Sequence, residues 1–434
     1  MTTTRSFCVE FMSRSVAKSI LGAALVLLAA RGVAADDVPY WRGQGHHGIY
    51  TEQGTRSTWP EGGPAQQWKT PGVGAGYSSP VVVGRRVYVT GYKERDGQRV
   101  EMLCCLDRDT GAVLWQSDYG QAWSKDYPGS RSTPTFSKGE IFAISGSGEV
   151  AKLDAASGAL LWKVNAKQLY KGVNGGWGSA ESPLVDDRAV YFTAGGSQTT
   201  MVALNRLDGS ALWQSRSFND KASYVSPTEI IHNGQRQIVG ATTNMLFGIK
   251  PESGELAWSC NFGQILDGGR TIKRYDIIAN SIVYRDGRLL LSNGYGHGTA
   301  MFKLNDDASA VETLWTNVDL SSQHHGFVWL GDVIYGASHN RKWTCVDAAT
   351  GRTLFSERVP QLGQAQVIAV DGRLLVYDSE RGNVILAKAE TGALAEICRF
   401  VIRDGEQQHW CHPVVAGGVL YLRRGDVAMA YDLK

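Results

Sequence analysis

A short motif recurs along most of this chain and limits the folds that the chain can adopt. In the stretch "CCLDRDTGAVLWQ" (104–116), an apolar run is followed by an Asp, a Thr-Gly pair and a Trp. Related stretches follow at 151–163, 202–214, 247–259 and 343–355, with a fainter copy at 386–396. The tryptophans of the first four copies stand 45 to 51 residues apart: Trp115, Trp162, Trp213 and Trp258. This period is typical of four-stranded propeller blades rather than of helical solenoids.

The motif has the chemistry of a hairpin turn. The carboxylate of Asp107 can accept hydrogen bonds from backbone N–H groups of the turn, and Gly111 can adopt the positive φ that closes it. Apolar and polar residues alternate on both sides of the turn, which is the period-two pattern of paired strands. We expect Trp115 and its equivalents to lie on the strand that leaves the turn, where the ring covers the seam between neighbouring blades.

Eight short segments open the repeats and set the number of blades. They are "YSSPVV" (77–82), "RSTPTF" (131–136), "AESPLV" (180–185), "YVSPTE" (224–229), "IANSIV" (278–283), "HHGFVW" (324–329), "QAQVIA" (364–369) and "WCHPVV" (410–415). The eighth repeat stops before its outer strand, whereas "GGPAQQWKT" (62–70) carries Trp68 with no strands before it. Pairing of the strand around Ala65–Lys69 with the last blade removes two open sheet edges. We therefore predict an all-β fold, an eight-bladed β-propeller of four-stranded antiparallel blades closed by the N-terminal strand.

The first 35 residues have the pattern of a secretory signal. Three basic residues precede an apolar run at 20–30, and Val33 and Ala35 fit the small-residue rule for cleavage. Either Met1 or Met12 fits as the start. The run is short for a membrane span, and no Cys follows it to accept a lipid. We expect a periplasmic or secreted protein after cleavage near Ala35, organised as a signal peptide (1–35), an N-terminal segment (36–63) and a propeller (64–434) with no membrane span.

Charge and cysteine spacing argue against several kinds of partner and site. Without residues 1–35 the chain has 40 basic and 41 acidic residues and no basic run, which disfavours nucleic acid or an anionic membrane as partner. The six remaining cysteines include no CxxC pair, so zinc and thioredoxin-like sites lack their usual spacing. Cys105 and Cys345 share one repeat position, which fits a small core side chain. Cys398 and Cys411 are expected on separate strands of blades seven and eight, too far apart to bridge.

The repeats resemble those of a known family. The "LDxxTGxxLW" copies, openings such as "GYSSPVV" and "WGSAESPLV", and the segment "PYWRGQGHHGIY" (39–50) carry the likeness. They are similar to those of the PQQ-like, quinoprotein-type eight-bladed β-propellers, and closest to exported bacterial members related to the outer-membrane assembly factor BamB. The resemblance covers about residues 39–434. It implies the fold but says little about activity, because the same fold serves redox enzymes and scaffolds.

Polar and aromatic residues gather in loops of one predicted face of the ring. In such propellers the loop before the first strand of a blade lies on the same face as the loop between its second and third strands. Six histidines fall in or beside these loops. We predict a ligand-binding site there, formed by Arg131, Trp177, Glu181, Tyr224, Asp276, His297, His325, His339, Arg341 and His412. The alternative explanation is that strand ends are simply polar.

The segment "HWCH" (409–412) contains metal-ligand residue types, but its geometry argues against a metal site. In an extended segment His409 and Cys411 point to one side, whereas Trp410 and His412 point to the other, so the four cannot share one ion. The adjacent pair His324–His325 divides in the same way. We expect no bound metal and no cofactor.

Two functions fit these observations. The first, which we favour, is an exported monomeric binding or scaffold propeller that recognises an envelope protein or a small molecule without catalysis. The second is a PQQ- and calcium-dependent alcohol or sugar dehydrogenase, which the shared fold implies. For this enzyme the resemblance implies calcium and quinone contacts and a base among Trp177, Glu181, Asp276 and Asn280. It also implies a disulfide between adjacent cysteines, but Cys104–Cys105 occupies a strand position, and no insertion of the chain would roof a cofactor.

Overall fold

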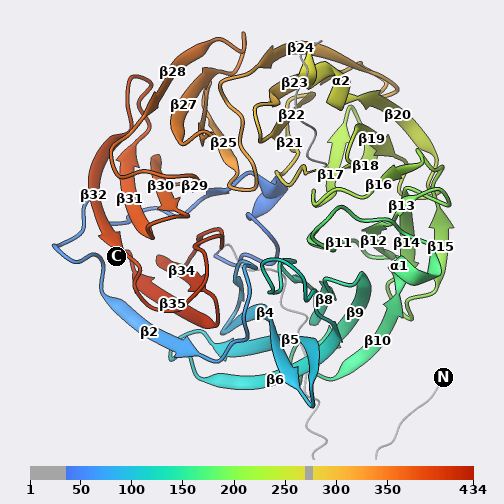
Figure 1. The fold of residues 1–434 in the computed structure, drawn as a ribbon, viewed down its shortest axis with the longest axis horizontal. Coiled ribbons are helices and arrows are strands. Elements are labelled where there is room, and N and C mark those ends of the chain that lie inside the picture. Colours follow the sequence, from blue (N-terminus) through green and yellow to red (C-terminus); the bar gives the residue numbers. More distant parts are fainter. Residues whose placement is uncertain (1–35, 269–276) are drawn as a thin grey trace, which may run out of the picture. The chain divides into compact units, whose positions relative to one another are not determined.

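The repeats form a ring of eight sheets. The computed structural model describes residues 36–268 and 277–434, and in this part of the chain eight antiparallel sheets surround a common centre (Figure 1). Within each sheet the strands follow one another from the centre of the ring outward. The predicted eight-bladed, nearly all-β propeller is therefore confirmed.

The first four blades follow the same strand order. Blade 1 consists of β3 (Val81–Val83), β4 (Arg86–Arg95), β5 (Gln98–Asp107) and β6 (Val113–Gln121). Blade 2 consists of β7 (Thr135–Ser137), β8 (Glu140–Ile144), β9 (Glu149–Asp154) and β10 (Leu160–Asn165). Blade 3 consists of β11 (Leu184–Val185), β12 (Ala189–Thr193), β14 (Met201–Asn205) and β15 (Ala211–Gln214). Blade 4 consists of β17 (Thr228–His232), β18 (Gln235–Ala241), β19 (Met245–Ile249) and β20 (Leu256–Asn261).

The remaining blades repeat this order until the last one. Blade 5 consists of β21 (Val283–Arg285), β22 (Arg288–Asn293), β23 (Gly298–Leu304) and β24 (Val311–Asn317). Blade 6 consists of β25 (Phe327–Leu330), β26 (Val333–Ala337), β27 (Lys342–Asp347) and β28 (Thr353–Arg358). Blade 7 consists of β29 (Ala365–Val370), β30 (Arg373–Asp378), β31 (Asn383–Lys388) and β32 (Ala395–Val401). Blade 8 consists of β33 (Val414–Ala416), β34 (Val419–Arg424), β35 (Val427–Asp432) and the N-terminal β2 (Gln66–Pro71).

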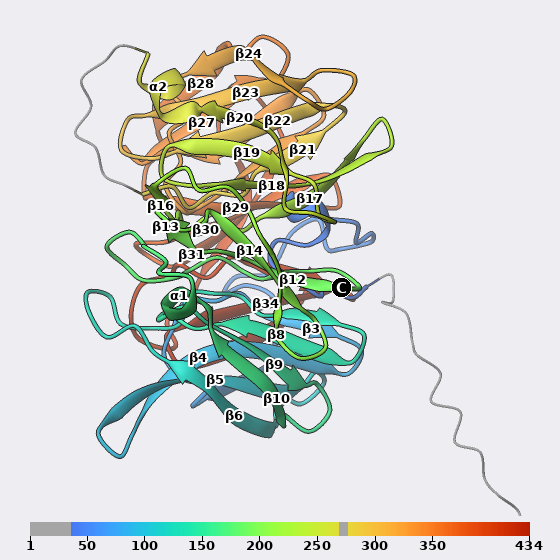
Figure 2. The ribbon, with the colours of Figure 1, turned by 90° about the vertical axis from the view of Figure 1, so that its right-hand side faces the viewer.

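A few short elements lie outside this scheme. The strand β1 (Ile49–Tyr50) pairs in parallel with β29, and β13 (Gly195–Gly196) pairs with β16 (Asp220–Lys221). The helices are η1 (Gln44–His46), α1 (Ala166–Leu169) and α2 (Phe262–Asp267). Figure 2 shows α1, α2 and the long β4–β5 hairpin on one side of the ring, which we call the loop face. No helix among the described residues combines the length and apolar character needed to cross a bilayer.

The predicted N-terminal closure is present in blade 8. The strand β2 pairs with β35 in antiparallel register, with Trp68 opposite Ala430 and Thr70 opposite Ala428. The same strand also reaches blade 1, because Trp68 Nε1 donates to the carbonyl of Arg108 at 2.8 Å. One strand therefore completes the last sheet and forms the seam with the first.

The repeat motif builds a turn followed by a β-bulge. Asp107 Oδ1 accepts hydrogen bonds from the N–H groups of Asp109 and Thr110, and Gly111 has a φ of 70°, as predicted. In every outer strand the residue just before the Trp position is an extra residue without a partner: Gln67, Leu114, Leu161, Leu212, Ala257, Leu314, Leu354 and Ile397. A bulge bends and twists the outermost strand, which makes its open edge a poor template for pairing with another chain.

The tryptophan of one blade rests on the turn glycine of the next. A Cβ added to Gly209 of blade 3 would lie 2.9 Å from the ring of Trp162 in blade 2, and Trp162 Nε1 donates to the carbonyl of Arg206 at 3.1 Å. Gly158, Gly254 and Gly351 meet the preceding tryptophan in the same way. Two constraints therefore favour glycine at this position: the positive φ of the turn and the tryptophan ring that leaves no room for a side chain.

Replacing Gly209 with alanine should therefore cost more than replacing a glycine that has only the φ requirement. Gly234, with a φ of 80° and nothing within 4 Å of an added Cβ, is the matched control. We expect Gly234→Ala to lower the free energy of unfolding by about 1 kcal/mol and Gly209→Ala by about 3 kcal/mol, since the second substitution adds a steric clash. Urea unfolding of both variants measures the difference. Equal losses would contradict the role assigned to the Trp162 contact.

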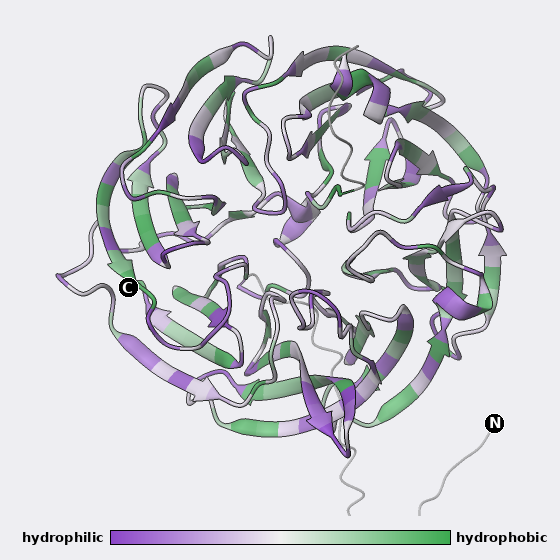
Figure 3. Ribbon diagram, viewed as in Figure 1, coloured by the Kyte–Doolittle hydropathy of each residue, from purple (hydrophilic) through white to green (hydrophobic). Residues whose placement is uncertain are grey.

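The hydrophobic core lies mainly between neighbouring blades. Buried side chains from facing sheets join in clusters, for example Tyr88 and Cys105 of blade 1 with Ile141 and Leu153 of blade 2. A larger cluster joins blades 7, 8 and 1 and includes Trp68. Figure 3 shows the hydrophobic segments concentrated in the strands of the blades. Each seam therefore contributes apolar burial to the ring as a whole.

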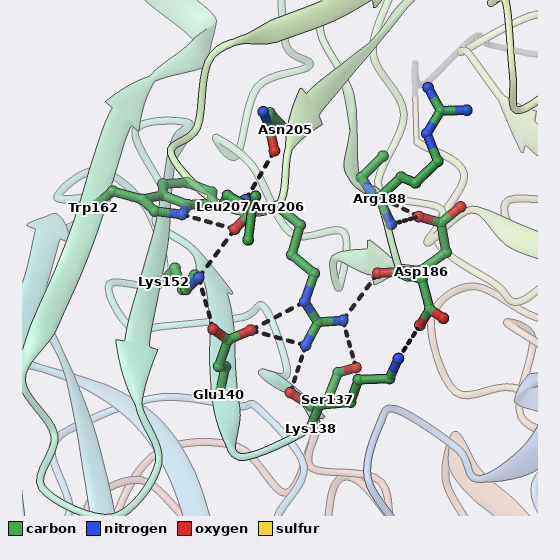
Figure 4. Close-up of polar contacts among 12 residues, drawn as sticks. Ser137, Lys138, Glu140, Lys152, Trp162, Asp186, Arg188, Asn205, Arg206 and Leu207 are labelled. Carbon is green, nitrogen blue, oxygen red and sulfur yellow. Dashed lines mark hydrogen bonds and ion pairs between the residues drawn. The ribbon is translucent and has the colours of Figure 1, made fainter.

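A buried ionic cluster adds to the seam between blades 2 and 3 (Figure 4). Arg206 lies in the turn of blade 3, and its guanidinium donates to Glu140 Oε2 of blade 2 from Nε at 3.0 Å and from Nη2 at 2.8 Å. Lys152 Nζ lies 2.7 Å from Glu140 Oε1. Both cationic side chains are 6% exposed, so removal of the Glu140 carboxylate would leave two buried charges unpaired.

The six cysteines in the described residues are all unbridged. Cys398 lies on β32, the outer strand of blade 7, as expected, whereas Cys411 lies in the segment before β33 rather than on the strand itself. Cys104 and Cys105 alternate across β5, so that Cys104 packs toward blade 8 and Cys105 toward blade 2. The adjacent pair therefore belongs to two seams.

Candidate functional site

A pocket of about 380 Å³ opens at the centre of the loop face. All eight blades, or the loops beside them, contribute to its walls, so it lies on the axis of the ring. In seven of the eight repeats the first residue of the opening segment lines it: Tyr77, Arg131, Ala180, Tyr224, His324, Gln364 and Trp410. The opening segments of the repeats therefore form much of the pocket wall.

Extended geometry decides which residues of each opening face the pocket. The third residue lines it in several repeats, as Thr133, Ser182 and His412 do. In seven repeats the second residue points back into the blade, as for Glu181, which is 3% exposed, and His325, which is fully buried. The fifth repeat is shifted by one residue, so that Ala279 lines the pocket. This alternation follows from the period of two in extended backbone.

The N-terminal segment forms the floor. Figure 1 shows this blue segment at the centre of the ring. Trp41 lines the pocket, and its ring meets that of His412 edge-on, with 5.3 Å between the centroids. Directly after it, Arg42 is 1% exposed, and burial lowers its pKa to about 10.

The buried guanidinium of Arg42 joins three blades. Nη2 donates to the Phe327 carbonyl of blade 6 at 2.6 Å, and Nη1 donates to the Val367 carbonyl of blade 7 at 3.3 Å. Nη1 also lies 2.9 Å from Nδ1 of His412. A Cβ at Gly326 would lie 2.3 Å from Nη1, so a side chain there would displace the arginine. The sequence interpretation did not single out Arg42.

Aromatic rings form two walls of the pocket. On one side Trp410 contacts Tyr77, Tyr127 and His324, with ring centroids 4.9, 5.1 and 4.9 Å away. On the other side Trp177 and Tyr224 lie with centroids 6.4 Å apart, and the Trp177 N–H donates to the Tyr224 hydroxyl at 3.1 Å. These walls can bind a planar apolar group through stacked or edge-to-face aromatic contacts.

Among the described lining residues Arg131 carries the only full charge. Its Nη2 donates to the carbonyls of Asp126 and Tyr127, and burial lowers its pKa. Burial also lowers the pKa of His324 to about 3 and holds that of His412 well below its ordinary value. These imidazoles are therefore neutral near pH 7 and leave the guanidinium as the single charge. No carboxylate belongs to the described lining.

The structure brings part of the predicted site together. Of the ten predicted residues, those that line the pocket are Arg131, Trp177, Tyr224, His339 and His412. Glu181 and His325 lie behind its wall. His297 Nδ1 lies 2.6 Å from Asp267, and Arg341 pairs with Glu380 at 2.7 Å, both outside the lining. Asp276 lies outside the described residues.

Other residues of the pocket were missed by the sequence interpretation. These are Trp41, Tyr77, Tyr127, Tyr295, Gln323, His324, Gln364 and Trp410. Four of them are first residues of opening segments, so their position in the repeat was the available signal. Tyr127 comes from a loop without a repeat pattern, whereas Tyr295 lies in the loop between β22 and β23, a kind of loop already predicted on this face. The Ser-Pro pattern of the opening segments does not predict which loop residues reach the pocket.

The described residues do not fit a calcium-bound quinone. Calcium prefers carboxylate and carbonyl oxygens, and the described lining offers no carboxylate. In the same part of the chain no three His, Cys, Asp or Glu side chains are grouped so that they could hold a metal. Cys104 and Cys105 lie in separate seams of β5, where burial raises both thiol pKa values.

Residues 99–357 match the model of a protein family described as outer membrane protein assembly factor BamB. The chain belongs to the BamB family. BamB of Yersinia pestis is 19% identical over 64% of this chain and 68% of its own length. BamB of Moranella endobia is 24% identical over 63% of this chain and 65% of its own length, and BamB of Alkalilimnicola ehrlichii is 25% identical over 49% and 50%. The chain thus spans between half and about two thirds of these BamB relatives.

Solved structures agree on the fold. BamB from Moraxella catarrhalis has a TM-score of 0.60 at 15% identity, covering 85% of this chain and 98% of that one. A europium-containing methanol dehydrogenase has a TM-score of 0.67 at 11% identity, with 91% of each chain covered. At these identities the likeness concerns the propeller alone, which BamB shares with enzymes.

Proposed function

We propose that this BamB-family chain is an exported binding or scaffold propeller, which recognises a small molecule or an envelope protein through the pocket on its loop face. Family membership supports a role in the bacterial envelope, and the pattern of residues 1–35 supports export with cleavage near Ala35. N-terminal sequencing of the exported protein tests the second point. A mature chain that retains residues 20–30 would contradict it.

The pocket is the observation that carries the proposal. A ring held by apolar seams has no structural need for Trp177, Trp410 and Tyr127 around an open cavity on its axis. A concave site with apolar walls and a few convergent polar groups is typical of ligand binding. The same surface can also hold an aromatic side chain of a protein partner.

The rival function is a PQQ-dependent dehydrogenase. The likeness to methanol dehydrogenase favours it at the level of the fold. The absence of carboxylates from the described lining and the separate positions of Cys104 and Cys105 count against it. We therefore rank this function second.

One experiment separates the two functions. The purified mature protein is incubated with PQQ and calcium, and cofactor absorbance is followed together with dye reduction by a panel of alcohols and sugars. We expect no substrate-dependent dye reduction. Stoichiometric PQQ binding with substrate-dependent turnover would contradict the scaffold proposal.

A capture experiment then tests the binding face. Trp177→Ala alters the pocket wall, whereas Ile231→Ala alters a side chain that is 63% exposed beside the turn on the opposite face. We expect the first variant to lose envelope components that the parent protein retains, and the second variant to retain them. Equal capture by both variants would argue against the pocket as the binding surface.

A further inference from the structure

We propose that the pocket takes a small, ring-bearing monocarboxylate, with Arg131 binding the carboxylate and the aromatic walls enclosing the ring. This inference rests on the proposed function, because it assumes that the pocket binds a ligand. It adds the chemical class of that ligand, which the BamB family does not specify.

The first argument is the unmet hydrogen-bonding capacity of Arg131. Its Nη2 donates to two backbone carbonyls at 3.2 and 2.7 Å, whereas its buried Nη1 has no hydrogen-bond partner among the described residues. A buried donor atom without a partner is unfavourable, and a carboxylate is the acceptor whose geometry matches a guanidinium.

The nearby carboxylate of Glu101 does not fill this place. Glu101 is 1% exposed behind the pocket wall, and Oε2 accepts from the hydroxyls of Tyr119 at 2.6 Å and Ser130 at 2.7 Å. Its Oε1 accepts from the Gly146 N–H at 2.7 Å. Glu101 acts on Arg131 through its electrostatic field, without a hydrogen bond, and leaves Nη1 without a partner among the described residues.

The second argument is the amount of charge. Arg131 is the single charged side chain in the described lining, and the neighbouring imidazoles are buried and neutral near pH 7. The guanidinium is the single positive charge that the described lining offers to an anion. A phosphate dianion would bring a second negative charge into a buried site that has no second cation among its described residues. A monocarboxylate therefore fits better.

The third argument is the position of the rings. The Arg131 guanidinium lies 6.0 Å from the centroid of the Tyr77 ring, and Tyr77 contacts Trp410. An anion held by Arg131 therefore lies beside the aromatic wall, so a ring attached directly to the carboxylate can reach it. The volume of about 380 Å³ admits one or two fused rings.

The test compares 2-naphthoate with 2-naphthamide, which have the same ring system and differ in charge. Isothermal titration calorimetry should show the carboxylate binding at least about tenfold more tightly. Arg131→Gln should weaken binding of the carboxylate to the level of the amide and leave the amide unchanged. Arg131→Lys should retain part of the preference, because it keeps the charge and loses the planar donor pair. The control is Arg341→Gln, whose ion pair with Glu380 lies outside the pocket lining.

Three results would overturn the inference. The first is equal binding of the carboxylate and the amide. The second is an unchanged carboxylate affinity in a folded Arg131→Gln protein with the melting temperature of the parent. The third is no binding of either probe at millimolar concentration. In each case the capture experiment with Trp177→Ala still decides separately whether the loop face is a binding surface.

Discussion

Removal of residues 60–70 is expected to abolish cooperative folding of this protein, because it takes β2 out of blade 8. Without β2, the strand β35 becomes an open edge, and Trp68, which is 7% exposed, no longer covers the seam between blades 8 and 1. Loss of one buried tryptophan alone costs about 3–5 kcal/mol, and native domains are stable by only about 5–15 kcal/mol. We expect aggregation or a molten chain in place of a sharp melting transition.

Soluble yield and circular dichroism melting measure this effect. A second variant, in which glycine and serine replace residues 66–70, keeps the length of the connection and removes only the strand. A synthetic peptide of residues 60–71 added during refolding should restore part of the native signal, since it can pair with β35 in the same register. A soluble deletion variant with an unchanged melting temperature would contradict N-terminal closure.

Acid should destabilise the protein strongly through buried histidines at the centre of the ring. Burial lowers the pKa of His46 to about 4 and that of His324 to about 3, and it holds the pKa of His325 and His412 well below 6.5. In the unfolded chain these imidazoles take up protons below about pH 6.5, whereas in the folded chain they remain neutral. Their contribution is therefore fully present above about pH 6.5 and is lost as the pH falls toward 4.

The melting temperature should fall by roughly 10 °C between pH 7.5 and pH 4.5. His325→Leu should reduce this fall, because His325 is fully buried and neither ring nitrogen has a hydrogen-bond partner among the described residues. A pH dependence that is the same in the parent and in His325→Leu would argue against this origin.

The blades were predictable because their signal is repeated. The Asp-to-Gly turn and the Trp strand recur often enough to locate seams and the closing strand, and the eight opening segments indicate the number of blades. One copy was missed, "LNDDASAVETLW" at 304–315, because its turn has Ala308 at a positive φ instead of a glycine. The bulge before each Trp was also missed, since an extra unpaired residue leaves the composition of a strand unchanged.

The pocket was harder to predict, for a physical reason. The predicted site residues were selected by the chemistry of their side chains, which favoured Glu181 and His325. Both are second residues of opening segments, and their side chains point into the blades. Register within each opening decides exposure, and Trp410 and His412 share the side that faces the axis. Trp41 and Arg42 come from a segment without repeats, so their place at the centre of the ring depends on tertiary contacts alone.

Closure by β2 also has a consequence for the order of folding. Each seam from blade 1 to blade 8 joins neighbours in the chain and can form as soon as the next repeat is available. The final contact is different, because Gln66 must meet Tyr431 across 365 positions of sequence. Contacts of such long range form slowly, and until then Trp68 and its unpaired strand are exposed to other chains. The first propeller strand to be synthesised is thus the last to be placed, and dilution or a chaperone that holds this segment should raise the yield of folded rings.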